Sequence, residues 1–201
     1  MSGATRPNNK HLMVCSGRAY PELADEVAQE LGVELVPSRQ VTYANSEIYV
    51  QFQESVRGCD AFVIQSHAAP VNEALMEQLI MVDALKRASA KRITVVSPFY
   101  PYARQDKKHL GREPISARLV ADLYRAAGAD RIMSVDLHAA QIQGFFDGPV
   151  DHLWALPVLS DYVREKYQGE EMAVVSPDAG RVRLADMWTD KLGCQPVSYT
   201  H

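Results

Sequence analysis

The chain has 201 residues, of which 47% are hydrophobic, so it can bury one large or two small cores and is too apolar to be disordered. Its net charge of -4 argues against a general nucleic-acid-binding protein, since such proteins present a positive face to the phosphate backbone. Cys15, Cys59 and Cys194 form no CxxC pair, so we expect neither disulfides nor structural zinc, as in a protein of the reducing cytoplasm. No apolar run reaches the length of a membrane span and the N-terminus is polar, so we expect a soluble protein without a membrane partner.

Short apolar runs rich in β-branched residues alternate with longer amphipathic segments along the chain. Each run is too short for a helix, so we expect strands at 11–15, 61–65, 92–97, 131–137 and 172–177. We expect helices at 21–32, 70–89, 115–128, 156–167 and 181–193, with prolines at helix starts and glycines at helix ends. This alternation predicts an α/β fold with a parallel sheet and helices on both faces.

The chain contains no internal repeat, low-complexity tract or obvious linker. The turn-rich stretch 145–152 is the best candidate for a domain boundary. We therefore expect one domain over residues 1–150 and the beginning of a second, shorter one over residues 151–201.

Polar residues follow the predicted strands, at the edge where parallel sheets bind ligands. Ser66-His67 follow the second run, and the stretch "PFYPYARQDKKHLGREPIS" (98–116, here called the cationic loop) follows the third. "DLHAAQIQ" and "SPDAGR" follow the last two runs. The candidate site residues on this edge are Arg104, Gln105, Asp106, Lys107, Lys108, Asp136, His138 and Asp178.

The composition of the cationic loop favours a polyphosphate ligand. Arg104 can bind phosphate oxygens through two parallel hydrogen bonds, and Lys107 and Lys108 add mobile positive charges. Gln105 and Asp106 could contact a sugar or a base. A run of charges can also be merely solvated, but its position at a strand end favours a binding site.

Carboxylates near the end of the fourth run indicate a magnesium site. Asp136 and His138 can point toward the same edge, and Asp147 and Asp151 follow in the next turn. Mg²⁺ prefers carboxylate oxygens and is normally shared with substrate phosphates. Because histidine is a poorer ligand, His138 could instead contact phosphate or a bound water, or serve only structure. Asp147 and Asp151 surround a Gly-Pro pair and can equally be turn formers.

Two further polar turns are candidates for ligand contacts. "VTYANSEIYV" (41–50) places Tyr43, Asn45 and Glu47 where an exposed ring could stack on a base, although ordinary loop chemistry explains them equally well. "SPDAGRVR" (176–183) places Asp178 at a strand-to-helix turn, where backbone N–H groups can bind an anion or Asp178 can cap the helix.

Together these motifs resemble the ribose-phosphate diphosphokinases, the synthetases of phosphoribosyl diphosphate. The family's motifs "ESVRG", "MEQLIMVDAL", "PYARQDKK", "PISARLVADL", "DLHAAQIQGFF" and "VVSPDAGRVR" occur in order between residues 11 and 193. Motifs of this length are far more specific than a lone glycine pattern. The resemblance implies two similar phosphoribosyltransferase-like domains that transfer the β,γ-diphosphate of ATP to the C1 hydroxyl of ribose 5-phosphate with Mg²⁺, in nucleotide biosynthesis.

The resemblance also implies roles for the candidate residues. It assigns ATP binding to Arg104, Gln105, Asp106, Lys107, Lys108 and His138, with Arg104 and His138 as catalytic residues. It assigns the metal region to Asp136, His138, Asp147 and Asp151, and the ribose 5-phosphate site to Asp178. Tyr43, Asn45 and Glu47 match an adenine-binding turn that is donated across a subunit interface, which implies a homo-oligomer with shared ATP sites. Tyr43 replaces the family's usual phenylalanine and should still stack.

The match with the family ends after Gly193, where the chain reads "CQPVSYTH". The family's basic flexible loop and its pentose-phosphate loop occur nowhere in the sequence. From the sequence alone we expect a chain truncated within the second domain and inactive by itself, because diphosphoryl transfer depends on positioning both substrates. The alternative is a non-catalytic nucleotide-binding or regulatory subunit of the same family.

Overall fold

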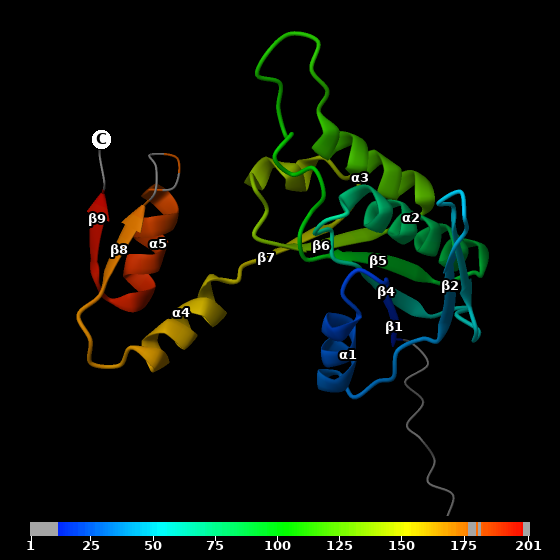
Figure 1. The fold of residues 1–201 in the computed structure, drawn as a ribbon, viewed down its shortest axis with the longest axis horizontal. Helices are drawn as coiled ribbons and strands as arrows, with labels where there is room; N and C mark the ends of the chain where they lie inside the picture. Colours follow the sequence, from blue (N-terminus) through cyan, green and yellow to red (C-terminus); the bar gives the residue numbers. More distant parts are fainter. Residues whose placement is uncertain (1–11, 177–179, 181, 199–201) are drawn as a thin grey trace, which may run out of the picture. The chain divides into compact units, whose positions relative to one another are not determined.

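The computed structural model describes residues 12–176, 180 and 182–198, and the chain divides into two compact units that meet at the Leu153–Trp154 bond. The first unit is built on a five-stranded parallel sheet in the order β1-β4-β5-β6-β7 (Figure 1). Its strands are β1 (Leu12–Ser16), β4 (Asp60–Ile64), β5 (Arg92–Ser97), β6 (Arg131–Val135) and β7 (Val150–Leu153). The predicted parallel α/β sheet is therefore confirmed.

Three helices cover this sheet from its two sides (Figure 1). They are α1 (Pro21–Glu30), α2 (Val71–Arg87) and α3 (Ser116–Ala127). Helices α2 and α3 pack together on one face, whereas α1 lies on the other. Pro21 begins α1, where its fixed φ suits the first turn, and Gly128 ends α3 with φ 119°, a conformation that is costly for other residues.

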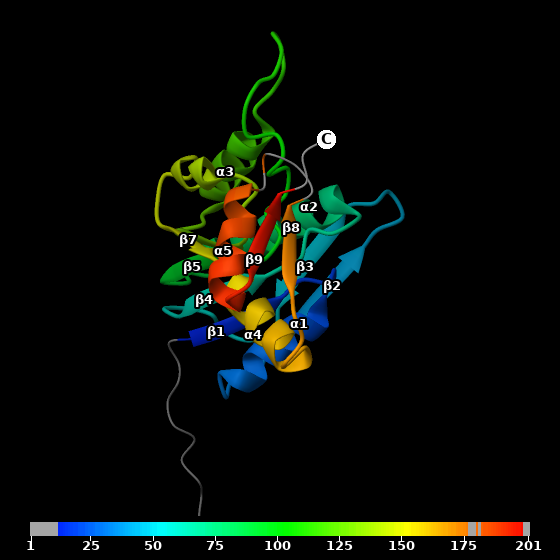
Figure 2. The ribbon, with the colours of Figure 1, turned by 90° about the vertical axis from the view of Figure 1, so that its left-hand side faces the viewer.

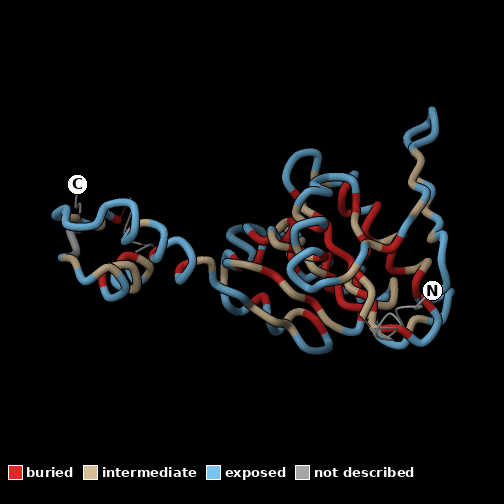
Figure 3. The backbone as a smooth tube through the Cα atoms, turned by 90° about the horizontal axis from the view of Figure 1, so that it is seen from below, coloured by how far each residue is buried: buried red, intermediate tan, exposed pale blue. Residues whose placement is uncertain are grey.

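The strands send alternate side chains into two separate cores, as the period of a strand requires. Cys15 and Val63 belong to the larger core under α2 and α3. Val14 and Ile64, their neighbours in sequence, belong to the smaller core that includes Ala24 of α1. Figure 3 shows buried residues concentrated along the strands and the inner sides of the helices. The sheet is thus a rigid platform for the loops at its carboxyl edge.

A β-hairpin that the sequence did not predict lies beside α2. Strands β2 (Ser38–Thr42) and β3 (Ile48–Phe52) pair antiparallel, with Thr42 opposite Ile48. Strand β3 packs along α2, and Val50 and Phe52 contact the larger core. The turn that carries Tyr43, Asn45 and Glu47 is the tip of this hairpin.

The second unit contains α4 (Leu156–Lys166), β8 (Ala173–Ser176), α5 (Val182–Leu192) and β9 (Gln195–Ser198). Strands β8 and β9 pair parallel, and α5 packs against them (Figure 2). Strand β7 extends beyond residue 150 and pairs with β6, so the first unit ends three residues after the expected boundary. None of the helices in the described part of the chain is long and apolar enough to cross a membrane.

Candidate functional site at the carboxyl edge of the sheet

The cationic loop and Asp136 leave the sheet side by side. Strands β5 and β6 pair in parallel with Ser97 opposite Ser134, so both chains reach the carboxyl edge together. Beyond this pair, the N–H of Val135 donates to the carbonyl oxygen of Pro98, at 3.1 Å. Asp136 therefore lies next to the start of the cationic loop, as the predicted parallel sheet requires.

Buried side chains fix the two ends of this loop. At its start, the Ser97 hydroxyl donates to the carbonyl oxygen of Phe99 at 3.0 Å. At its end, the hydroxyl of buried Tyr100 donates to the carbonyl oxygen of Ala117 in α3, at 2.9 Å. The N–H of Ala117 also donates to the carbonyl oxygen of Gln105, at 3.1 Å. The loop therefore begins and ends in fixed positions.

Asp106 is turned into the protein and holds the middle of the loop. Its side chain is 7% exposed, and its Oδ2 accepts a hydrogen bond of 2.5 Å from Nε2 of Gln141 in the 3-10 helix η1 (Ala140–Gly144). Gln105 is exposed and its Oε1 accepts from the Ser116 hydroxyl at 2.5 Å. Sequence reasoning did not single out Gln141, since nothing in its spacing links it to Asp106.

The cations of the loop face solvent. Arg104, Lys107 and Lys108 are all exposed, and the cationic loop extends away from the sheet (Figure 1, green). Toward the tip, the Glu113 carboxylate accepts backbone hydrogen bonds from Leu110 and His109, at 2.9 and 2.7 Å. These two bonds lower the pKa of Glu113 and keep it ionised. The loop thus presents exposed cations on an internally hydrogen-bonded backbone.

The structure brings only part of the predicted metal region to this edge. Asp136 has a left-handed backbone with φ 47°, which aspartate tolerates, and its N–H donates to the carbonyl oxygen of Leu153 at 2.9 Å. His138 follows it and is exposed. Asp151 instead pairs with Arg131, the first residue of β6, at 2.6 Å, and Asp147 lies in the loop before β7. Among the described residues, no three His, Cys, Asp or Glu side chains form a group that could hold a metal.

The hairpin turn has a defined shape and an exposed ring. The N–H of Tyr43 donates to the carbonyl oxygen of Glu47, and Oδ1 of Asn45 accepts from the N–H of Glu47, at 2.8 and 3.2 Å. The Tyr43 side chain is 51% exposed, with its ring centroid 6.4 Å from that of Tyr49. Asp178, the remaining predicted contact, lies outside the described residues.

A buried histidine lies beneath the start of the loop. His67 is fully buried, and its Nδ1 lies 2.8 Å from the Ser97 hydroxyl and 3.2 Å from the carbonyl oxygen of Phe99. Its Nε2 lies 3.4 Å from the hydroxyl of Tyr124, which donates to Gln78 at 2.8 Å. Burial outweighs these hydrogen bonds and lowers the pKa of His67 from 6.5 to about 4. The imidazole is therefore neutral at physiological pH.

We expect His67 to make the first unit less stable as the pH falls from 6.5 toward 4. The unfolded chain takes up a proton in this window and the folded protein does not, so the free energy of unfolding decreases by about 2 kcal/mol between pH 7 and pH 5. Urea unfolding of the wild type at the two pH values should show this loss. It should be largely absent in His67→Gln and unchanged in His109→Gln, whose ring is exposed. An equal loss in His67→Gln would contradict this assignment.

Comparison with known proteins relates this geometry to a family. Residues 12–128 match the family model of the N-terminal domain of ribose phosphate pyrophosphokinase. The chain is 65% identical over its 201 residues to the ribose-phosphate pyrophosphokinase of Streptomyces coelicolor and 63% identical to that of Mycobacterium tuberculosis. It spans 62% of the length of each of these relatives.

A solved structure shows the same fold. The crystal structure of phosphoribosylpyrophosphate synthetase from Mycobacterium smegmatis matches this chain with a TM-score of 0.90 and 65% sequence identity. The match covers 94% of this chain and 65% of that one.

Proposed function

Because this chain belongs to the ribose-phosphate pyrophosphokinase family, we propose that it provides the ATP-binding part of an enzyme that transfers the diphosphate of ATP to ribose 5-phosphate, yielding phosphoribosyl diphosphate and AMP. The family membership confirms the resemblance found in the motifs. One structural observation carries the proposal: exposed Arg104, Lys107 and Lys108 lie on a loop fixed at both ends, beside Asp136 at the carboxyl edge of a parallel sheet.

In this proposal the cationic loop binds the triphosphate and stabilises the charge that develops during transfer. Arg104 donates two hydrogen bonds to phosphate oxygens, while Lys107 and Lys108 neutralise the remaining charge. Arg104 and His138 act closest to the transferred group, as donors to its oxygens. Gln105 contacts the ribose or the base, and Asp106 serves chiefly to fix the loop through Gln141.

The residues at this edge fit a magnesium ion that is shared with the substrate. Mg²⁺ commonly binds one or two carboxylates and completes its shell with waters and phosphate oxygens, so a cluster of three protein ligands is not required. Asp136 offers an exposed carboxylate beside the cationic loop, and His138 can hold a water or a phosphate oxygen. When bound, the ion neutralises charge on the phosphates. Asp151 is engaged with Arg131 and Asp147 lies in the loop before β7, so both are the weaker candidates.

We assign the adenine to the hairpin turn and the pentose phosphate to the region of Asp178. Tyr43 stacks on the base, with Asn45 and Glu47 as hydrogen-bonding neighbours, and the turn completes the ATP site of an adjacent copy in a homo-oligomer. The second unit is the beginning of a second phosphoribosyltransferase-like domain. Support comes from the exposed ring and ordered backbone of the turn, and from the strand and helix alternation of the second unit.

We expect Tyr43→Ala to weaken Mg-ATP binding about tenfold or more, because stacking of a base on an aromatic ring contributes about 1–3 kcal/mol. Inorganic tripolyphosphate, which lacks a base, should bind the variant as it binds the wild type. Isothermal titration of both ligands into the chain at micromolar concentration makes the comparison. Tyr20→Ala, which removes another exposed tyrosine of the first unit, is the control and should change neither affinity. Equal losses for ATP and tripolyphosphate would exclude a base contact at Tyr43.

A further inference from the structure

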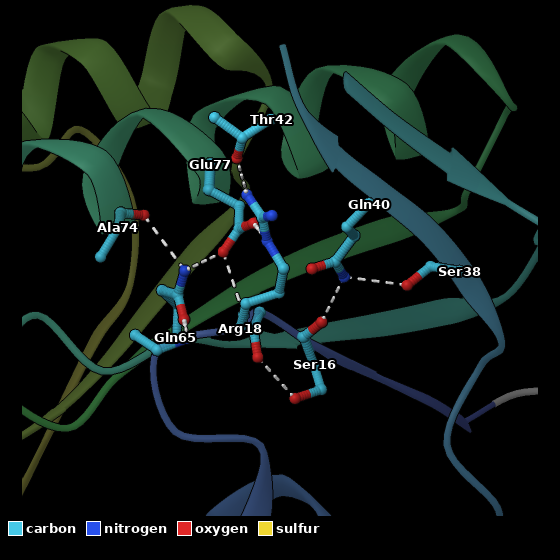
Figure 4. Close-up of polar contacts among 10 residues, drawn as sticks. Ser16, Arg18, Ser38, Gln40, Thr42, Gln65, Ala74 and Glu77 are labelled. Carbon is cyan, nitrogen blue, oxygen red and sulfur yellow. Dashed lines mark hydrogen bonds and ion pairs between the residues drawn. The ribbon is translucent and has the colours of Figure 1, made fainter. Parts of the chain in front are cut away.

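A buried polar cluster joins the ends of β1 and β4 to α2, on the side of the sheet where the hairpin lies (Figure 4). At its centre is Glu77, whose side chain is 3% exposed. Its carboxylate accepts three hydrogen bonds: from Nε of Arg18 at 2.5 Å, from the N–H of Arg18 at 3.0 Å and from Nε2 of Gln65 at 2.7 Å. Both the backbone and the side chain of Arg18 are thus held by one carboxylate.

Packing around Gln65 makes this arrangement rigid. Gln65 is 1% exposed, donates to the carbonyl oxygen of Ala74 at 3.3 Å and accepts from the N–H of Ala19 at 3.2 Å. Its carboxamide lies so close to Gly17 that a Cβ there would meet it at 2.3 Å. The chain that leaves β1 therefore has little freedom to move, and Arg18 leaves it in a defined direction.

The contribution of this cluster to folding stability does not by itself explain its presence. A buried carboxylate carries a desolvation cost that its ion pair often only offsets, and an apolar pair of similar size can be equally stable. A directional ion pair does, however, hold the guanidinium in one orientation. With Nε of Arg18 bonded to Glu77, the two terminal nitrogens of the guanidinium are held where they can contact another element.

Arg18 extends from the cluster to the hairpin. Its Nη2 donates to the hydroxyl of Thr42 at 2.9 Å (Figure 4). Thr42 is the last residue of β2 and directly precedes Tyr43. A second contact supports the same strand, because Nε2 of Gln40 donates to the carbonyl oxygen of Ser16 at 2.7 Å. Strand β3 is held by α2, whereas β2 is held to the end of β1 by these polar contacts.

We propose that Arg18 is a positioning residue for nucleotide binding, which sets the direction of the turn 43–47 through Thr42 while Glu77 fixes Arg18. The inference rests on the proposed adenine role of Tyr43. The hydrogen bonds within the turn define its internal shape, and α2 holds the β3 side of the hairpin, so the direction of the turn also depends on what holds the end of β2. The Arg18–Thr42 contact supplies that direction one residue away from the stacking ring.

Arg18→Met tests the proposal, because methionine keeps an unbranched side chain and removes the donors. We expect Mg-ATP to bind about tenfold more weakly, and inorganic tripolyphosphate to bind as in the wild type. A general loss of structure would weaken the binding of both ligands. Arg87→Met is the matched control. It breaks the exposed ion pair between Arg87 and Asp83, 2.7 Å apart on α2, the helix that also carries Glu77, and it should change neither affinity.

Thr42→Val keeps the test decisive if Arg18→Met folds poorly. Valine has nearly the shape of threonine, and residue 42 is exposed, so the variant removes only the hydroxyl that Arg18 contacts. The pairing of Arg18 with Glu77 is left intact. The loss of this one exposed hydrogen bond should weaken Mg-ATP binding about threefold, again without an effect on tripolyphosphate. Normal ATP binding by Arg18→Met and Thr42→Val, with weakened binding by Tyr43→Ala, overturns the positioning role alone. Normal binding by Tyr43→Ala as well overturns the adenine assignment and the positioning role with it.

Discussion

Replacing Arg104 and Lys107 by alanine is expected to weaken Mg-ATP binding at least about a hundredfold. Each hydrogen bond between a cationic side chain and a phosphate oxygen contributes about 1.5–3 kcal/mol, and about 1.4 kcal/mol corresponds to a tenfold change in affinity. The double variant should unfold at the wild-type urea concentration, because both side chains are exposed and exposed charges contribute little to stability. Isothermal titration with Mg-ATP measures the effect.

The control for this experiment lies at the other end of the same strand. Lys91 and Arg92 are exposed at the amino end of β5. The ion pair of Arg92 with Asp60 is long, at 4.0 Å, and therefore weak. Lys91→Ala with Arg92→Ala removes the same charge from the chain as the loop variant does. We expect it to change the affinity for Mg-ATP less than about threefold, through long-range electrostatics alone. A similar loss in both double variants would show that net charge, rather than the cationic loop, governs binding.

The regular elements of the core could be predicted because their side chains carry a local signal. The run of buried β-branched residues around Val95 is too short for a helix and too apolar for a loop. Every expected strand and helix is present, with boundaries that move by at most two residues. Proline and glycine mark helix ends because the fixed φ of proline suits the first turn and glycine adopts a positive φ after the last turn, as at Pro21 and Gly128.

Strands that depend on pairing with another strand, rather than on their own apolar residues, gave no such signal. Strand β2 reads "SRQVT" and contains a single apolar residue, Val41, and β7 has only four residues. The first is a strand because it pairs with β3 and the second because it pairs with β6. Strand formation here follows from tertiary packing rather than from intrinsic preference.

The same limit applies to the site. Strand ends identified the cationic loop and Asp136, since the carboxyl ends of parallel strands meet at one edge. Spacing did not reveal that Asp106 is turned inward to Gln141 or that Asp151 pairs with Arg131, because both partners come from other elements. Arg18 and Glu77, 59 residues apart, have no local pattern at all.

The central claim, that this chain carries the ATP-binding part of a diphosphotransferase, is tested most directly by turnover. The 201 residues would replace the corresponding 62% of the Streptomyces coelicolor relative, and AMP release from Mg-ATP would be followed with and without ribose 5-phosphate. We expect the hybrid to release AMP only when ribose 5-phosphate is present, at a rate near that of the unmodified relative. Arg104→Ala in the hybrid should lower this rate by about a hundredfold, as loss of a donor to the transferring group does. A folded hybrid that binds Mg-ATP but releases no AMP with ribose 5-phosphate would contradict the catalytic proposal and favour a non-catalytic nucleotide-binding subunit.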